Sequence, residues 1–274
     1  MKELIKGLRR FKSEYFCRNQ QLFEKLAHGQ QPRVLFITCS DSRVDPELLT
    51  SAAPGEIFVI RNAGNIVPPY GATNGGEGAT IEYAVQVLGI DQIVVCGHSH
   101  CGAMKGLLKL ETLREELPLV YEWLKHAEGT RRLLQEHYGD RTGEDLLDTA
   151  IAENVLTQIE NLRTYPVIRA GLFNGDLKIY AWIYDIDTGE VVAYDPETHA
   201  YVPPQSLLSP EELDAELLTP AIEGCALPTS SNGFSSQPTT ASTREMVPAN
   251  QRFPFVYMSP EQADRIYRGS KASR

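Results

Sequence analysis

Short apolar runs alternate with segments of helical periodicity over the first 200 residues of the chain. The runs "RVLFIT" (33–38), "EIFVIRN" (56–62) and "QIVVCGH" (92–98) consist mostly of branched apolar side chains, which is typical of strands buried in a parallel sheet. Between them, "EGATIEYAVQVLG" (77–89) has the periodicity of a helix that ends at a glycine. This order predicts an α/β fold with a mainly parallel sheet, right-handed crossovers and flanking helices.

The segments on either side extend this pattern. Residues 1–29 have apolar side chains at helical spacing, which predicts one or two amphipathic helices. Residues 103–173 are predicted to be helical throughout, most clearly over 144–163. Residues 177–195 are predicted to form a β-hairpin around an Asp-Thr-Gly turn, with a first arm that can join the sheet.

The character of the chain changes after residue 202. We therefore predict one folded domain over 1–202 and a C-terminal extension over 203–274. The extension contains a predicted flexible linker over 224–252, rich in Ser, Thr, Pro and Gly in its first part, followed by an aromatic and basic end. This end has the composition of a docking segment; alternatively, it folds over its own domain or over a dimer partner.

Composition narrows the function classes. The net charge of −10 argues against a nucleic-acid partner, because phosphate contacts need clustered Lys and Arg. No apolar run approaches the ~20 residues of a membrane span, and the N-terminus lacks the apolar core of a secretory signal. We therefore predict a cytoplasmic protein. In a reducing compartment, the odd number of five cysteines indicates metal ligation for some and burial for the rest.

Candidate metal ligands follow two of the predicted strands. Cys39 comes directly after the first strand, and His98 and Cys101 follow the third. If these strands are neighbours, the three side chains meet at the carboxyl edge of the sheet. Two thiolates and an imidazole suit Zn²⁺, and three protein ligands leave a fourth position open, as in catalytic zinc sites. The alternative is two buried core thiols and a hydrogen-bonded histidine.

A carboxylate and a guanidinium lie beside the first candidate ligand. Asp41 could bind the metal or accept a hydrogen bond from metal-bound water, and Arg43 could hold it in a bidentate ion pair. The alternative is a structural salt bridge at the entry of a helix that begins after Asp45. Cys96 and Cys17 are interpreted as packing residues.

Four motifs together resemble the β-class carbonic anhydrases over about residues 1–200. They are "CSDSR", "PGEIFVIRNAGNIVPPYG", "ATIEYAVQVLG" and "HSHCG". The resemblance implies one Zn²⁺ per subunit held by Cys39, His98 and Cys101, with Asp41 and Arg43 as a dyad beside the zinc-bound water. It also implies a homodimer, or a larger oligomer built from dimers. An N-terminal helix would embrace the partner, and the active site would lie at the interface.

The family has two variants, and the resemblance favours one of them. In the first, the aspartate moves onto zinc, and a Trp, an Arg and a Tyr trap bicarbonate nearby. The matching positions here are Phe36, Arg61 and Tyr184, so the Trp is missing. This departure favours the plant-like variant, in which water occupies the fourth position. The residues that line the pocket of that variant match Gln30, Phe58 and Tyr83.

The implied activity is the reversible hydration of CO₂ to bicarbonate and a proton by attack of zinc-bound hydroxide. His100 could carry the proton away or could simply face solvent. The extension is similar to that of carboxysomal enzymes of cyanobacteria, which implies a carboxysome scaffold protein as partner and a place beside the CO₂-fixing enzyme. Alternatives are a related zinc hydrolase acting on another cumulated substrate such as CS₂, and a non-catalytic scaffold-binding module.

Overall fold

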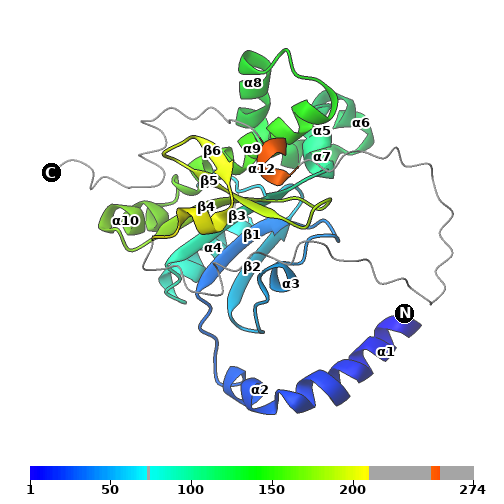
Figure 1. The fold of residues 1–274 in the computed structure, drawn as a ribbon, viewed down its shortest axis with the longest axis vertical. Coiled ribbons are helices and arrows are strands. Elements are labelled where there is room, and N and C mark those ends of the chain that lie inside the picture. The colour runs from blue at the N-terminus through cyan, green and yellow to red at the C-terminus, as the bar shows by residue number, and fades with distance from the viewer. Residues whose placement is uncertain (73–74, 210–247, 254–274) are drawn as a thin grey trace.

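A single six-stranded sheet forms the centre of the computed structural model, which describes residues 1–72, 75–209 and 248–253 (Figure 1). The strand order is β2-β1-β3-β4-β5-β6; the first four strands are parallel and the last two antiparallel. This confirms the predicted α/β fold and the hairpin whose first arm joins the sheet. The strands are β1 (Val34–Cys39), β2 (Ile57–Asn62), β3 (Gln92–His98), β4 (Lys178–Tyr184), β5 (Val191–Asp195) and β6 (Ala200–Val202).

Alternate residues of the strands serve two different apolar clusters. Leu35 and Ile37 of β1 belong to the large core, whereas Phe36 between them belongs to a smaller cluster with Val94 and Cys96 of β3. This follows from the two-residue repeat of a strand, which sends successive side chains to opposite faces. Both faces are apolar, as expected for a parallel sheet.

Helices cover the face of the sheet that carries the large core. The longest, α9 (Gly143–Leu162), packs on β3 and β4, and α4 (Gly76–Gln86) packs on β2 (Figure 1). The predicted helix over 144–163 is thus confirmed, as is the helical character of 103–173. The others in this region are α5 (Gly102–Leu107), η2 (Leu110–Thr112), α6 (Leu113–Glu116), α7 (Pro118–Leu124), η3 (Lys125–Ala127), α8 (Glu128–His137) and α10 (Pro166–Asn174).

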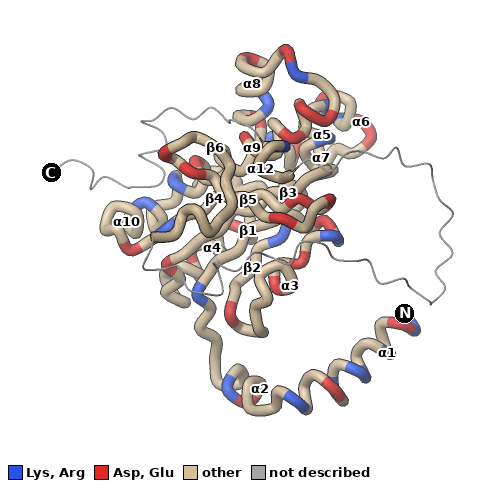
Figure 2. Tube along the Cα trace, in the orientation of Figure 1, with Lys and Arg blue, Asp and Glu red and all other residues tan. Residues whose placement is uncertain are grey.

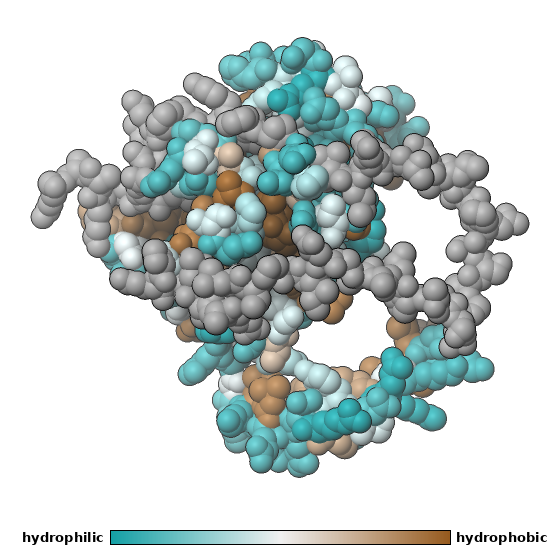
Figure 3. All heavy atoms as spheres, in the orientation of Figure 1, coloured by the Kyte–Doolittle hydropathy of each residue, from teal (hydrophilic) through white to brown (hydrophobic). Residues whose placement is uncertain are grey.

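The N-terminal helices form an arm that extends away from the sheet (Figure 1). The arm consists of α1 (Lys2–Arg10), η1 (Phe11–Phe16) and α2 (Gln20–Leu26), and none of their residues is buried. Aromatic rings pack within the arm, with the centroids of Phe16 and Phe23 4.8 Å apart. Charges of both signs lie along it (Figure 2). Its apolar side chains Leu4 and Leu8 are exposed, and apolar atoms are visible on the surface of the arm (Figure 3).

The described part of the extension contains two short elements. The first, η4 (Pro204–Leu207), follows β6, and the second is the helix α12 (Ala249–Arg252). The predicted linker, 224–252, overlaps this helix at its C-terminal end. Ala249 and Phe253 are almost fully buried, and apolar burial offsets the conformational entropy that ordering this segment costs. Residues 224–247 of the predicted linker, which include Cys225, and residues 254–274 of the aromatic-basic end lie outside the described residues.

A short helix after the first strand begins as predicted. Helix α3 (Pro46–Thr50) has Asp45 as its N-cap, and the Asp45 Oδ1 atom accepts the Leu48 N–H at 3.0 Å. The loop that follows Cys39 ends where this helix begins. Among the described residues, no helix combines the length and the apolar character that crossing a membrane requires.

Candidate metal centre

The ends of two adjacent strands bring three candidate ligands together. Strand β1 pairs with β3 in parallel, so that Cys39 and His98 reach the same edge of the sheet. Cys101 is the N-cap residue of α5, one turn after His98. The three ligand atoms lie within 4.8 Å of one another, and all three residues are buried. The predicted convergence of the three side chains is confirmed.

The imidazole of His98 has the geometry of a metal ligand. Its Nδ1 atom lies 2.8 Å from the Ser99 carbonyl oxygen, which can only accept, so Nδ1 donates and the neutral ring keeps a lone pair on Nε2. The buried Nε2 atom has no hydrogen-bond partner among the described residues. A lone pair beside two thiols, with its other nitrogen fixed by a carbonyl, is the arrangement of histidine in zinc sites. This favours a ligand over a hydrogen-bonded core histidine.

The two thiols interact with each other and with a backbone amide. The Gly64 N–H donates to Cys39 Sγ at 3.3 Å. The hydrogen bond from Cys101 lowers the pKa of Cys39, and the same contact together with burial raises the pKa of Cys101. Gly64 has φ +86°, and a Cβ added there would lie 2.9 Å from the Cβ of Ala103. Only glycine therefore brings this amide so close to the sulfur.

Asp41 and Arg43 form a bidentate pair at the mouth of the cluster. Arg43 donates from Nε to Oδ1 at 2.9 Å and from Nη2 to Oδ2 at 2.7 Å. These hydrogen bonds hold the pKa of Asp41 well below its usual range, so the carboxylate is ionised at neutral pH. Its Oδ2 atom is 3.9 Å from His98 Nε2. The pair thus presents a negative oxygen to the three candidate ligands.

Comparison with known proteins identifies the family. Residues 34–191 match the family model described as carbonic anhydrase. A carbonic anhydrase of Synechocystis is 53% identical in an alignment 276 residues long, which covers 99% of this chain and 100% of that protein. The solved structure of the β-carbonic anhydrase CcaA is 61% identical, with a TM-score of 0.74 over 74% of this chain and 99% of that one. The chain belongs to the β-class carbonic anhydrases.

A more distant β-carbonic anhydrase has the same fold. One from Sordaria macrospora, described as tetrameric, is 30% identical, with a TM-score of 0.63 over 70% of this chain and 94% of that one. The central sheet and its helices are therefore shared with an enzyme of fungal origin.

In this β-carbonic anhydrase, Arg61 holds the loop after Cys39. Its guanidinium donates to the carbonyl oxygens of Cys39 at 3.2 Å, Asp41 at 2.8 Å and Val44 at 2.7 Å. The resemblance to the family matched Arg61 to an arginine that traps bicarbonate in the other variant. Here its Nε and Nη2 atoms donate to backbone oxygens, so Arg61 fixes the path of the loop that carries Asp41.

A buried polar ladder on α9 supports the loop that contains Gly64, and the sequence analysis missed it. Asn154 Nδ2 donates to the Gly64 carbonyl at 3.0 Å, and Gln158 Nε2 donates to Asn154 Oδ1 at 2.9 Å. The Val67 N–H donates to Gln158 Oε1 at 2.9 Å. Two amides four residues apart inside an apolar helix, "AENVLTQ", are the signal that could have revealed this ladder.

His100 is held by carboxylates. Its Nε2 atom lies 2.7 Å from Asp187 Oδ2, and its Nδ1 atom lies 3.5 Å from Glu144 Oε2. The side chain is 21% exposed. His100 therefore does not simply face solvent, because its ring is mostly covered and paired with Asp187. Its role as a proton carrier stays a prediction.

The predicted substrate-binding residues lie away from the ligands of the same chain. On β2, Asn62 pairs with Cys39, whereas Phe58 lies four residues earlier and pairs with Leu35. Phe58 is therefore about 13 Å along the strand from the residue beside Cys39. Phe58 and Tyr83 are neighbours, with ring centroids 6.2 Å apart. Gln30 is exposed in the connection between α2 and β1. One chain by itself does not bring these three side chains to the metal centre.

Proposed function

We propose that this carbonic anhydrase holds Zn²⁺ with Cys39, His98 and Cys101 and uses it for the reversible hydration of CO₂ to bicarbonate and a proton. The observation that carries the proposal is the unpartnered lone pair of His98 Nε2 beside two buried thiols. Two sulfurs and one imidazole nitrogen form a donor set that selects zinc, and three ligands leave one position for a small reactant.

The chemistry combines a metal ion with a charged pair of the chain. Zinc would supply a Lewis acid that lowers the pKa of a water molecule from 15.7 to about 7. The Asp41 carboxylate, kept ionised by Arg43, accepts a hydrogen bond from the attacking water and thereby directs its lone pair toward the carbon of CO₂. The hydrogen bonds from Arg61 keep Asp41 in place during this step.

The apolar wall for CO₂ comes from a second copy of the chain in this proposal. Gln30, Phe58 and Tyr83 are too far from the ligands of their own chain to serve them, and the arm formed by α1, η1 and α2 has no buried residue. A homodimer in which the arm packs on the partner would bury its apolar side chains and bring these residues to the partner's metal centre. Larger assemblies of such dimers remain compatible with this arrangement.

The extension gives the enzyme its place in the cell in this proposal. The similarity to the Synechocystis carbonic anhydrase runs over 99% of the chain and so includes the extension. We infer that the extension, residues 203–274, binds a carboxysome scaffold protein, which places the enzyme beside the CO₂-fixing enzyme. A chain that ends at Val202 should fail to co-purify the scaffold protein that the full-length chain retains. Retained binding by the shortened chain would contradict this part of the proposal.

The decisive experiment measures metal content and turnover on the same full-length protein. We expect about one zinc per chain, with CO₂ hydration that a strong chelator abolishes and added Zn²⁺ restores. Undiminished hydration by the metal-free protein would contradict the proposal. A parallel assay with CS₂ as substrate tests the related hydrolase activity. No feature of the described residues favours that activity.

A further inference from the structure

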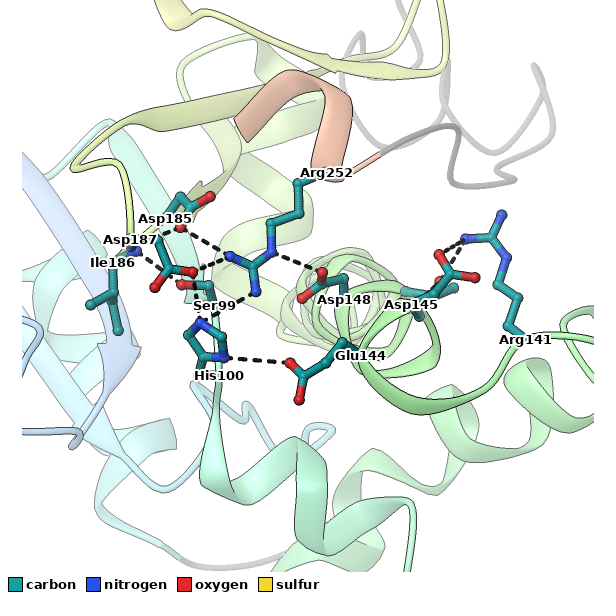
Figure 4. A network of polar contacts seen from close by, with 11 residues as sticks. Ser99, His100, Arg141, Glu144, Asp145, Asp148, Asp185, Ile186, Asp187 and Arg252 are labelled. Carbon is teal, nitrogen blue, oxygen red and sulfur yellow. Dashed lines mark hydrogen bonds and ion pairs between the residues drawn. The ribbon is translucent and has the colours of Figure 1, made fainter. Parts of the chain in front are cut away.

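Arg252 of the C-terminal extension reaches the segment between two of the candidate metal ligands (Figure 4). Its Nε atom donates to Asp148 Oδ2 at 2.8 Å, and its Nη1 atom donates to Asp185 Oδ1 at 3.3 Å and also to Asp187 Oδ2. Its Nη2 atom lies 3.4 Å from His100 Nε2. One guanidinium thus joins α9 to the β4–β5 turn and, through the shared Asp187 carboxylate, to His100 in the turn between His98 and Cys101.

The Arg252 guanidinium neutralises a cluster of carboxylates that have little exposure to water. The side chain of Asp185 is fully buried and that of Asp148 is 10% exposed. Burial raises the pKa of Asp148, and the hydrogen bond from Arg252 opposes this shift. The other nearby groups are also acidic, because Asp187 and Glu144 flank His100. Without Arg252 this cluster would contain several carboxylates and no guanidinium, which is unfavourable at low exposure.

The backbone of His100 is strained, and its surroundings keep it so. His100 has φ +58°, a left-handed conformation that is uncommon for any residue other than glycine. It lies two residues after His98 and directly before Cys101, so its conformation determines how both ligands face the site. Such a conformation persists where neighbouring groups hold it in place. Here they are Asp187 on the ring, and Arg43, whose Nη2 atom lies 3.4 Å from the His100 carbonyl oxygen.

We propose that Arg252 is a positioning residue for the metal centre. Through Asp187 it holds His100, and through His100 it holds the strained turn that presents His98 and Cys101 to the metal. This inference rests on the proposed metal centre and assigns part of its rigidity to a residue of the extension. A turn held in its ligating conformation loses metal more slowly than one that can relax, because supporting contacts orient the ligands.

The helix that carries Arg252 has contacts of its own. Phe253 is 1% exposed, and its ring centroid lies 6.5 Å from that of Tyr201. The Ala249 N–H donates to Glu190 Oε2 at 3.0 Å, and Ala249 is fully buried. Replacement of Arg252 by an uncharged side chain therefore removes the guanidinium while these contacts still hold α12 on the sheet.

The test compares metal retention in full-length proteins loaded with Co²⁺ and with Zn²⁺. We expect Arg252→Gln to accelerate metal loss to a chelator by about 10- to 100-fold and to alter the thiolate-to-cobalt absorption band. The matched control is Arg131→Gln, which removes a bidentate arginine pair with Glu128 on α8. This control should leave both measurements unchanged, and Arg252→Lys should fall between Arg252→Gln and the wild type.

A double-variant cycle separates positioning from general stability. Asp187→Asn should also accelerate metal loss, and the double variant with Arg252→Gln should be no faster than Arg252→Gln alone, because both changes break the same chain of contacts. Arg252→Gln that lowers the unfolding midpoint but leaves the chelator rate and the cobalt band unchanged would overturn the inference. A wild-type protein that takes up neither ion would instead overturn the proposed metal centre.

Discussion

The ligand edge of the sheet and the N-terminal arm differ in how much of their surroundings one chain provides. At the ligand edge, Cys39, His98 and Cys101 are buried, and buried amides of α9 hold the neighbouring loop. In the arm, no residue of α1, η1 or α2 is buried, and apolar side chains face outward. The three candidate ligands are therefore assembled within a single chain, whereas the substrate wall requires a second copy in our proposal.

Strand β1 carries one of the candidate ligands at the end of a buried apolar segment. Cys39 belongs to the large core together with Leu35 and Ile37, whereas Phe36 belongs to the smaller cluster on the other face. The ligand edge is therefore built on apolar packing within one chain. The comparison between self-contained and shared regions can be tested by changing one region at a time.

The largest expected effect is that of Cys39→Ser. Loss of one sulfur from the donor set should remove zinc and lower CO₂ hydration by about 10³-fold or more, because the Lewis acid supplies several kcal/mol to the reaction. Zinc content and stopped-flow hydration measure both. Cys17→Ser is the matched control, since Cys17, which the sequence analysis interpreted as a packing residue, is instead exposed on the N-terminal arm. Full zinc content in Cys39→Ser would contradict the ligand assignment.

The second largest effect is expected from Asp41→Asn. The amide keeps the shape of the side chain but loses its charge and its pairing with Arg43, so zinc should stay bound while kcat falls by about 10- to 100-fold. Asp45→Asn is the control on the same loop, because asparagine also caps a helix. If Asp41→Asn keeps full activity, the carboxylate has no part in directing the attacking water.

Deletion of residues 1–29 tests the shared region. We expect the shortened chain to sediment as a monomer, to keep about one zinc and to lose activity on the order of 10-fold, because the substrate wall from the second copy is no longer fixed. Sedimentation, zinc content and hydration should be measured on the same sample. A shortened chain that remains a fully active dimer would show that the arm does not join the copies.

The smallest effect is expected from Cys96→Ala. Cys96 is fully buried on β3, and burial raises the pKa of its thiol to about 12, so it remains protonated and inert. The change should lower the free energy of unfolding by about 1 kcal/mol and leave zinc and kinetics unchanged. Urea unfolding measures the first. Zinc loss in this variant would mean that packing beneath the ligand edge, and not the ligands alone, holds the ion.

The sequence pattern predicted those parts of the molecule that depend on local repeats. The bounds of β3 agree with the run 92–98, and α9 lies within one residue of the predicted 144–163. The meeting of Cys39 with His98 also followed, since parallel neighbouring strands end at one edge. These features need only periodicity and a topological rule.

The contacts that the sequence pattern did not predict depend on distant residues. Arg61 donates to three carbonyl oxygens, and no local pattern indicates which backbone groups lack a partner. Asn154 and Gly64 are 90 residues apart, and Arg252 and His100 are 152 residues apart. Residue types alone do not indicate such pairs, because many polar side chains could pair equally well before the fold is known.

The position of Arg252 has a practical consequence for work with shortened proteins. The region shared with the family model ends at residue 191, before α12 begins. A fragment cut at that border would retain Cys39, His98 and Cys101, but it would lose Arg252 and with it the guanidinium that pairs with Asp148 and Asp185. Such a fragment would be a poor substitute for the whole enzyme in any study of how firmly it keeps its ion.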